Sequence, residues 1–197
     1  MSTLSKSEEL MRVIALSTYE LVMPESLRSR VATACLSVAL DHHHAITILV
    51  ANDRLASAFA LARPVFESFI RGTWLTHCAT DVQVEEFSTG WSPPKIDLLL
   101  KELESKPGYD GKVLSTIKAS SWTSMCAYTH TGGLQIQRWQ TEYSVEPQYD
   151  QEEVEEVLEF TNLFASLSAV EMVEISGIEE KLEALTKSLA PYLPAGA

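Results

Sequence analysis

The chain has 197 residues, of which 46% are hydrophobic and 21% are charged, and its formal net charge is −12. Its length corresponds to one domain, and its composition is that of a globular rather than a disordered protein. We therefore expect one domain over residues 1–197. The acidic excess is local, because residues 142–197 hold 13 acidic and 2 basic residues. General nucleic-acid binding is not expected, since it requires many Lys and Arg side chains to neutralise phosphates.

The N-terminus and the apolar runs indicate where the protein resides. The first residues, MSTLSKSEELMRV, carry acids where a secretory signal has a basic start and an apolar block. Uncharged apolar runs such as residues 55–62 are far shorter than the ~20 residues that span a bilayer. The three cysteines, Cys35, Cys78 and Cys126, have the spacing of neither a disulfide framework nor a zinc site. We expect a cytoplasmic protein with no membrane association, metal or cofactor.

Apolar residues recur at helical spacing along nearly the whole chain, and no alternating strand pattern occurs. This pattern predicts an all-α protein, an up-and-down bundle of about seven or eight helices. The second and third helices should form a long central antiparallel hairpin. A short helical turn and a connector are expected between Gly133 and Gln148. The main helices are expected at residues 5–22, 25–51, 53–78, 81–88, 95–106, 110–130, 151–176 and 178–189.

Several residues are expected to start, bend or end these helices. Pro64 predicts a kink in the third helix or a break just before it, and both alternatives stay open. Asp81 is expected to cap the fourth helix, and residues 92–94, Ser-Pro-Pro, to precede the fifth. Asp150 with Glu153 has the spacing of a capping box at the start of the long C-terminal helix.

Arg63, Glu67 and Arg71 form the first candidate site, because their spacing of four places them on one helix face. They are the only Asp, Glu, Lys or Arg residues between Leu55 and Cys78. One interpretation is a surface ion-pair ladder of small energetic value. The other is a polar pocket whose guanidinium groups bind a carboxylate or phosphate.

The second candidate is the run Asp41-His42-His43-His44. Adjacent helical residues point about 100° apart, so three neighbouring histidines cannot converge on one metal ion. Antiparallel counting along the hairpin places the histidines level with residues 60–63. One of them is therefore expected to approach Arg63, and His43 is included among the candidate ligand-binding residues.

The third candidate is the segment AYTHTGGLQIQRW, residues 127–139. It has a structural interpretation, in which His130 is an imidazolium at a helix C-terminus and Gly132 or Gly133 is the left-handed cap. Alternatively, His130 and Arg138 complete a pocket that faces the Arg63 stripe. This second hypothesis predicts that the side chains of Arg63 and His130 lie within a few ångströms of each other.

Two stretches also resemble a known group of proteins. ARPVFESFIRGTW, followed by a helix ending in YTHTGGLQIQR, resembles an uncharacterised bacterial family of all-helical proteins of unknown function. Such bundles are in turn similar to HEPN-type helical domains, which include RNA-cleaving toxins and phage-defence proteins. The HEPN resemblance implies that Arg71 and His77 are a catalytic pair in a metal-independent ribonuclease, although Gly72 stands where these enzymes have a polar residue.

The leading hypothesis is a polar pocket, formed by Arg63, Glu67, Arg71, His130 and Arg138, that binds a small anionic molecule or a nucleotide. A HEPN-like ribonuclease is the enzymatic alternative. A third possibility is a non-enzymatic interaction protein, most simply a homodimer, whose acidic C-terminal helix docks a partner. Dimerisation is expected because helices that are apolar on most sides need to be covered.

Overall fold

The computed structural model describes residues 1–92 and 94–192. These residues form nine α-helices, eight of them with seven or more residues, and contain no strand. The prediction of an all-α bundle is therefore confirmed. The helices are α1 (Thr3–Thr18), α2 (Leu27–Ala51), α3 (Leu55–His77), α4 (Asp81–Ser88), α5 (Ile96–Leu103), α6 (Val113–Thr129), α7 (Gly133–Gln137), α8 (Gln151–Ser176) and α9 (Glu179–Leu189), followed by a 3-10 turn at Ala190–Tyr192.

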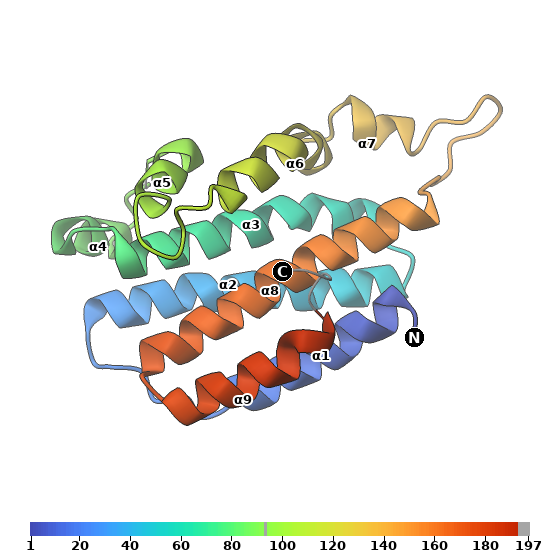
Figure 1. The fold of residues 1–197 in the computed structure, drawn as a ribbon. Coiled ribbons are helices and arrows are strands. Elements are labelled where there is room, and N and C mark those ends of the chain that lie inside the picture. The colour runs from blue at the N-terminus through green and yellow to red at the C-terminus, as the bar shows by residue number, and fades with distance from the viewer. Residues whose placement is uncertain (93, 193–197) are drawn as a thin grey trace.

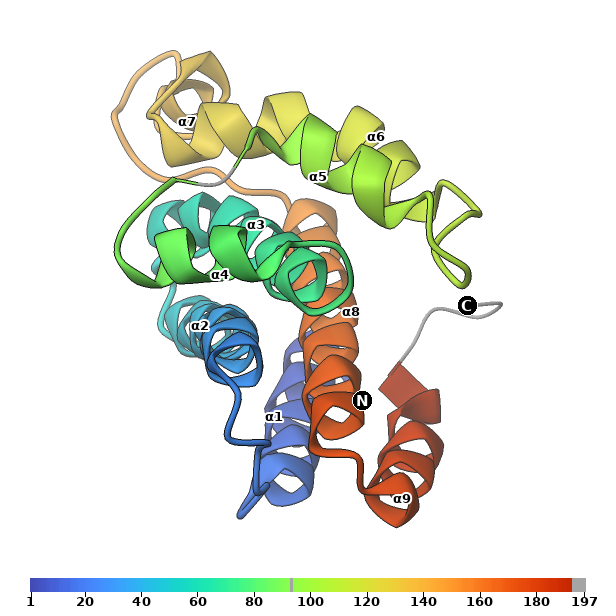
Figure 2. The ribbon, with the colours of Figure 1, turned by 90° about the vertical axis from the view of Figure 1, so that its left-hand side faces the viewer.

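The helices stack in tiers, and α3 lies between two of these tiers (Figure 1). The helices α5, α6 and α7 lie on one side of α3, and α2 and α8 lie on the other. The helices α1 and α9 form the outermost tier beneath α2 and α8. The view from the end of the bundle shows α4 beside α3, at the end where α3 finishes (Figure 2). The helix α3 therefore contacts four of the other helices extensively, namely α2, α5, α6 and α8.

The helices α2 and α3 form the expected antiparallel hairpin, which turns at Asp53 in the left-handed conformation (φ 56°). The two helices approach closely at Gly72. A Cβ atom at this position would lie 2.7 Å from Cγ of Leu36 and 3.2 Å from the carbonyl oxygen of Ala32. Glycine is thus required at residue 72 for the close packing of α2 against α3.

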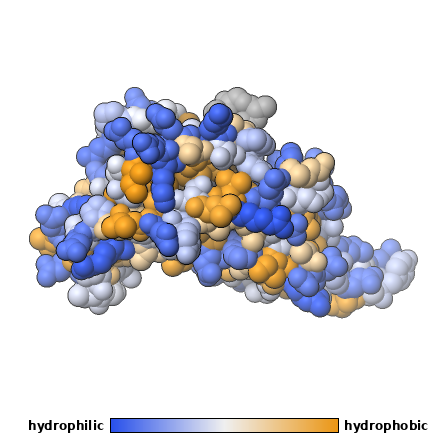
Figure 3. All heavy atoms as spheres, turned by 90° about the horizontal axis from the view of Figure 1, so that it is seen from below, coloured by the Kyte–Doolittle hydropathy of each residue, from blue (hydrophilic) through white to orange (hydrophobic). Residues whose placement is uncertain are grey.

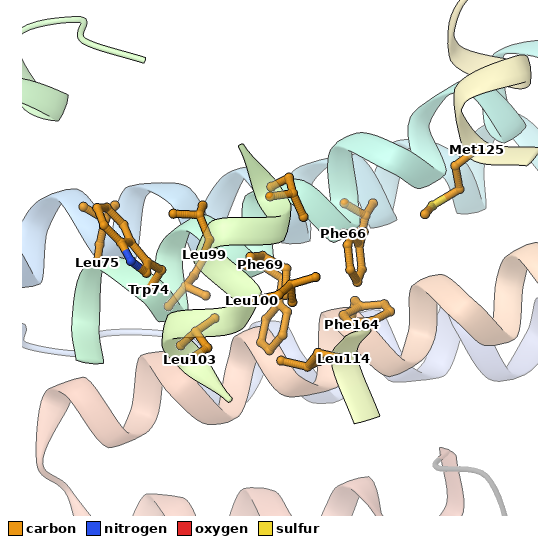
Figure 4. Packing of buried hydrophobic residues seen from close by; sticks show 14 of the residues in the cluster. Phe66, Phe69, Trp74, Leu75, Leu99, Leu100, Leu103, Leu114, Met125 and Phe164 are labelled. Carbon is orange, nitrogen blue, oxygen red and sulfur yellow. The ribbon is translucent and has the colours of Figure 1, made fainter. Parts of the chain in front are cut away.

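The main hydrophobic core lies where α2, α3, α5, α6 and α8 meet. Phe66 and Phe69 of α3 both pack on Phe164 of α8, with ring centroids 5.0 Å and 5.3 Å apart (Figure 4). Trp74 is fully buried and donates a hydrogen bond from its indole nitrogen to Glu102 at 2.6 Å. A second apolar cluster, which includes Leu10 and Val173, joins α1, α8 and α9. Burial of these side chains fixes the elements that carry the candidate site.

Some of the predicted helix ends need correction. The helix α3 continues through Pro64 without a break. Thr80, rather than Asp81, caps α4, because the Thr80 hydroxyl and the Gln83 side chain exchange hydrogen bonds with each other's backbone N–H groups. The capping box of Asp150 and Glu153 is confirmed. Pro93 of the predicted Ser-Pro-Pro start lies outside the described residues.

By length and composition, α2 alone among the helices of residues 1–92 and 94–192 could cross a membrane. Core helices meet the same criteria, and α2 packs against both α3 and α8. The cytoplasmic location and the absence of membrane association remain predictions.

Candidate functional site

Pro64 and Thr129 join α3 to the C-terminal end of α6. Proline has no backbone N–H, so Pro64 leaves the carbonyl of Ala60, four residues earlier, without its helical donor. The hydroxyl of Thr129 donates a hydrogen bond to this carbonyl at 3.1 Å. The side-chain amide of Gln135 donates to the carbonyl of Ala56, one turn earlier on α3, at 3.3 Å. The turn after α6 is therefore docked on the first half of α3.

The turn after α6 has the hydrogen bond of a Schellman motif, in which the N–H of Gly132 bonds to the Ala127 carbonyl at 2.7 Å. The left-handed residue is Thr131, with φ 54°, so the expectation that Gly132 or Gly133 has this conformation is wrong. Gly132 is needed for space instead, because a Cβ there would lie 3.0 Å from Cα of Ala127. This tight turn places His130 directly beside α3.

Arg63 and His130 are in contact, which confirms their predicted proximity. Nη1 of Arg63 lies 2.7 Å from Nε2 of His130, and the guanidinium group stacks 4.7 Å from the ring centroid of Trp122. Because arginine can only donate, Nε2 of His130 accepts this hydrogen bond, and the imidazole is neutral in this arrangement. The imidazolium expected at the helix end is therefore not the form that contacts Arg63.

Glu67 connects the two arginines of the stripe. Its Oε1 accepts from Nε of Arg63 and its Oε2 from Nη2 of Arg71, each at 2.7 Å. Burial acts to raise the carboxyl pKa, but the hydrogen bonds from Arg71 and Arg63 outweigh it and hold the pKa of Glu67 below its usual value. The side chains of Arg63, Glu67 and Arg71 are 22%, 14% and 29% exposed. Arg63, Glu67 and Arg71, with His130 and Trp122 in contact with Arg63, are called the Arg63 network below. This network is partly buried and continuous, and solvent can still reach it.

Further groups extend this network at both ends. Lys118 lies 4.6 Å from the ring centroid of Trp122 and forms an ion pair with Asp97 at 2.9 Å. At the other end, Arg71 lines a mostly apolar groove of about 490 Å³ between α2 and α4, together with Cys35. Burial raises the pKa of the Cys35 thiol to about 11, although Arg71 opposes this change, so the thiol stays protonated at neutral pH.

Arg138 does not join the Arg63 network as expected. Its guanidinium group instead forms an ion pair with Glu153. Glu153 also accepts from the backbone N–H of Asp150 at 3.3 Å, as part of the capping box of α8. Arg138 therefore ties the connector after α7 to the start of α8, which is a structural role.

His43 is also engaged elsewhere, since it faces α8. Its Nε2 lies 2.8 Å from Oδ1 of Asn162, and the residue is 1% exposed. Burial lowers the pKa of His43 to about 4, although the Asn162 hydrogen bond opposes this change. The imidazole is consequently neutral at pH 7 and is part of the core rather than of the Arg63 network.

Arg71 and His77 face different surroundings, as their six-residue offset suggests. Nε2 of His77 lies 2.9 Å from Oε2 of Glu171 on α8. His77 lines a cavity beside α8, whereas Arg71 lines the groove beside α4. The expected catalytic pair therefore shares neither a partner nor a pocket within the described residues.

Comparison with known families places the chain in a family but assigns it no function. A model described as "Family of unknown function (DUF6988)" matches residues 36–194. The chain belongs to this family. No curated protein and no solved structure matches it. The predicted membership of an uncharacterised family is thus confirmed, whereas the HEPN resemblance is not. The family match contains the whole Arg63 network, together with Thr129 and Pro64, and leaves out α1.

Sequence reasoning missed several residues that make these contacts. Trp122 is the one aromatic residue in the polar stretch KASSWTS, a signal that could have indicated a stacking role. Glu171 is the one charged residue in the apolar run FASLSAVEMV, a pattern like that of Arg63, Glu67 and Arg71 in α3, and this signal could have indicated a functional role. Thr129 carried no such signal, since its partner is a backbone carbonyl on another helix.

Within residues 1–92 and 94–192, no group of three or more His, Cys, Asp or Glu residues could hold a metal ion.

Proposed function

We propose that this protein binds a small oxyanion, a carboxylate or a phosphate group, at the Arg63–Glu67–Arg71 network. Support comes chiefly from one observation: Arg63 is fixed in place by Glu67, His130 and Trp122 together. A guanidinium held on three sides loses little further side-chain entropy when a ligand binds. Such preorganisation is what a binding site needs and what a surface ion pair does not.

The charge of the network also favours an anion. Two guanidinium groups are joined to a single carboxylate, and the His130 ring that contacts Arg63 is neutral, so a net positive charge remains. Glu67 accepts from one N–H group of each arginine, and His130 accepts from a second N–H group of Arg63. The other guanidinium N–H groups of the two arginines are the ones that would donate to oxyanion atoms. Partial burial weakens the screening of these charges by water, which strengthens their attraction for a ligand.

The competing explanation is that the Arg63 network only stabilises the fold. The small net stability expected from such a network argues against this explanation. Partly buried ion networks contribute little net stability, because desolvation of the charges offsets their attraction. The docking of α6 on α3 is already supplied by the Thr129 hydroxyl and by apolar packing. The docking of α6 on α3 therefore does not depend on the network alone, which favours ligand binding as the account of it.

Calorimetric titration with inorganic phosphate, pyrophosphate and acetate tests this proposal. We expect wild-type protein to bind at least one of these anions, and Arg63→Gln to weaken that binding about tenfold, since one charge-assisted hydrogen bond contributes about 1.4 kcal/mol or more. Arg12→Gln is the matched control, because Arg12 is an exposed arginine on α1. Equal binding by all three proteins, or no binding by the wild type, would contradict the proposal.

A further inference from the structure

A separate cavity of about 700 Å³ lies between the C-terminal end of α3, the loop joining α5 to α6, and α8. The apolar part of its lining includes Phe69, Leu114, Leu167 and Val170. Phe69 and Leu114 both belong to the main core, in which Phe69 packs on Phe164 (Figure 4). The volume is within the range of cavities that hold small organic molecules, roughly 300 to 1,000 Å³.

The polar part of the lining centres on Glu171, which lies on α8 like Leu167 and Val170. The Glu171 side chain is 6% exposed and accepts a hydrogen bond from His77 at one oxygen and from Tyr109 at the other. Glu174 lies three residues later on the same helix and lines the same cavity. Two carboxylates therefore line this cavity. Among its lining residues in the described part of the chain, Lys106 is the only lysine or arginine.

Glu171 raises the pKa of three neighbouring titratable groups, and for two of them burial is the larger cause. The Glu171 hydrogen bond raises the pKa of His77 despite opposing effects of burial and Lys106. Burial and then the Glu171 charge raise the pKa of Glu174, with His77 opposing. Burial and then Glu171 also raise the pKa of Tyr109, to which Glu174 and Cys78 contribute. All three groups are shifted towards the form that carries more positive charge.

We infer that this cavity binds an organic cation, an amine or ammonium group carrying an apolar body, with the cationic group between Glu171 and Glu174 and the apolar body against Phe69 and Leu114. A lining that combines carboxylates with aliphatic and aromatic side chains matches the two parts of such a ligand. The charge preference is opposite to that of the Arg63 network, so this site is independent of the proposed function.

Three probes with the same alkyl chain and different head groups test this inference: octylamine, octanol and octanoate. Calorimetric titration of the wild-type protein at pH 7.5 should give the tightest binding for octylamine and the weakest for octanoate. Glu174→Gln should weaken octylamine binding about tenfold and leave octanol binding within twofold. Glu159→Gln, an exposed position on the same helix, should leave both unchanged and controls for attraction of amines to an acidic protein.

A second variant tests the apolar part without touching the charges. Val113 lines the cavity and is 62% exposed, so Val113→Trp can fill the cavity without disturbing the core. This variant should lose binding of octylamine and octanol together while keeping the unfolding temperature of the wild type. Equal affinity for octanoate and octylamine, or octylamine binding that Glu174→Gln and Glu159→Gln reduce equally, would overturn the inference.

Discussion

Pro64 and Thr129 illustrate how single residues connect two distant parts of this chain. Pro64 withholds a backbone N–H from the Ala60 carbonyl, and Thr129, 69 residues beyond Ala60, supplies a hydroxyl donor in its place. Their neighbours Arg63 and His130 then meet. The two stretches that carry the family resemblance are thus brought together because the Thr129 hydroxyl replaces the hydrogen bond that Pro64 cannot make.

Replacement of Thr129 by valine should destabilise the protein by about 1 kcal/mol, because the Ala60 carbonyl loses its donor. In a Pro64→Ala background the helix supplies its own N–H, so the same substitution should cost much less. Urea unfolding of the wild type, both single variants and the double variant measures this coupling. An equal cost of Thr129→Val in both backgrounds would show that the hydroxyl does not replace the missing helical bond.

His43 should make the stability of the protein depend on pH. Its pKa is about 4 in the folded chain and 6.5 as the ordinary value, so the unfolded state binds a proton more readily. This contribution to stability is complete above pH 6.5 and is lost as the pH falls, by about 2 kcal/mol at pH 5. His43→Gln cannot titrate, and its free energy of unfolding should fall less between pH 7 and pH 5 than that of the wild type. Parallel losses in the two proteins would refute the assignment.

At the scale of elements, helical periodicity was sufficient to predict most helices, because each long helix buries an apolar face. The capping box at Asp150 was also predictable, since its partners lie three residues apart. The partners of Arg138 and His43 are Glu153 and Asn162, which both lie on α8. These partners could not be predicted, because the irregular connector before α8 gives no indication of where α8 packs on the other helices. Contacts between elements are set by tertiary packing, which local spacing does not record.

The turn after α6 provides a test with its own control. Gly132→Ala should destabilise the protein by about 1 to 3 kcal/mol, because the added methyl group meets the backbone of Ala127 at 3.0 Å. Gly133→Ala should change stability by less than about 0.5 kcal/mol, since nothing lies within 4 Å of its Cβ position. Thermal unfolding distinguishes the two. Equal effects would indicate that the close approach of Gly132 is not required.

For the whole molecule, the outer surface bears on assembly. The face seen from below, where α1 and α9 lie, carries several apolar patches separated by hydrophilic side chains (Figure 3). Leu16 and Val22, each 78% exposed, lie at the end of α1 and in the loop that follows it. Such surface is the reason for expecting a second copy of the chain to cover it.

The homodimer remains a prediction that light scattering can test. We expect a mass of twice the 21.8 kDa of one chain. Leu16→Glu combined with Val22→Glu should reduce this to the mass of one chain, because burying the new carboxylates in an apolar interface is unfavourable. A wild-type mass of one chain at concentrations of about 100 μM would contradict the prediction.

The central claim is that the Arg63 network binds an oxyanion, and diffraction from crystals soaked in tungstate tests it most directly. Tungstate has the shape and charge of a phosphate dianion and a strong anomalous signal. We predict an anomalous peak within about 4 Å of the guanidinium nitrogens of Arg63 or Arg71. No peak at this position, with the Arg63 and Arg71 side chains ordered and still paired with Glu67, would contradict the claim.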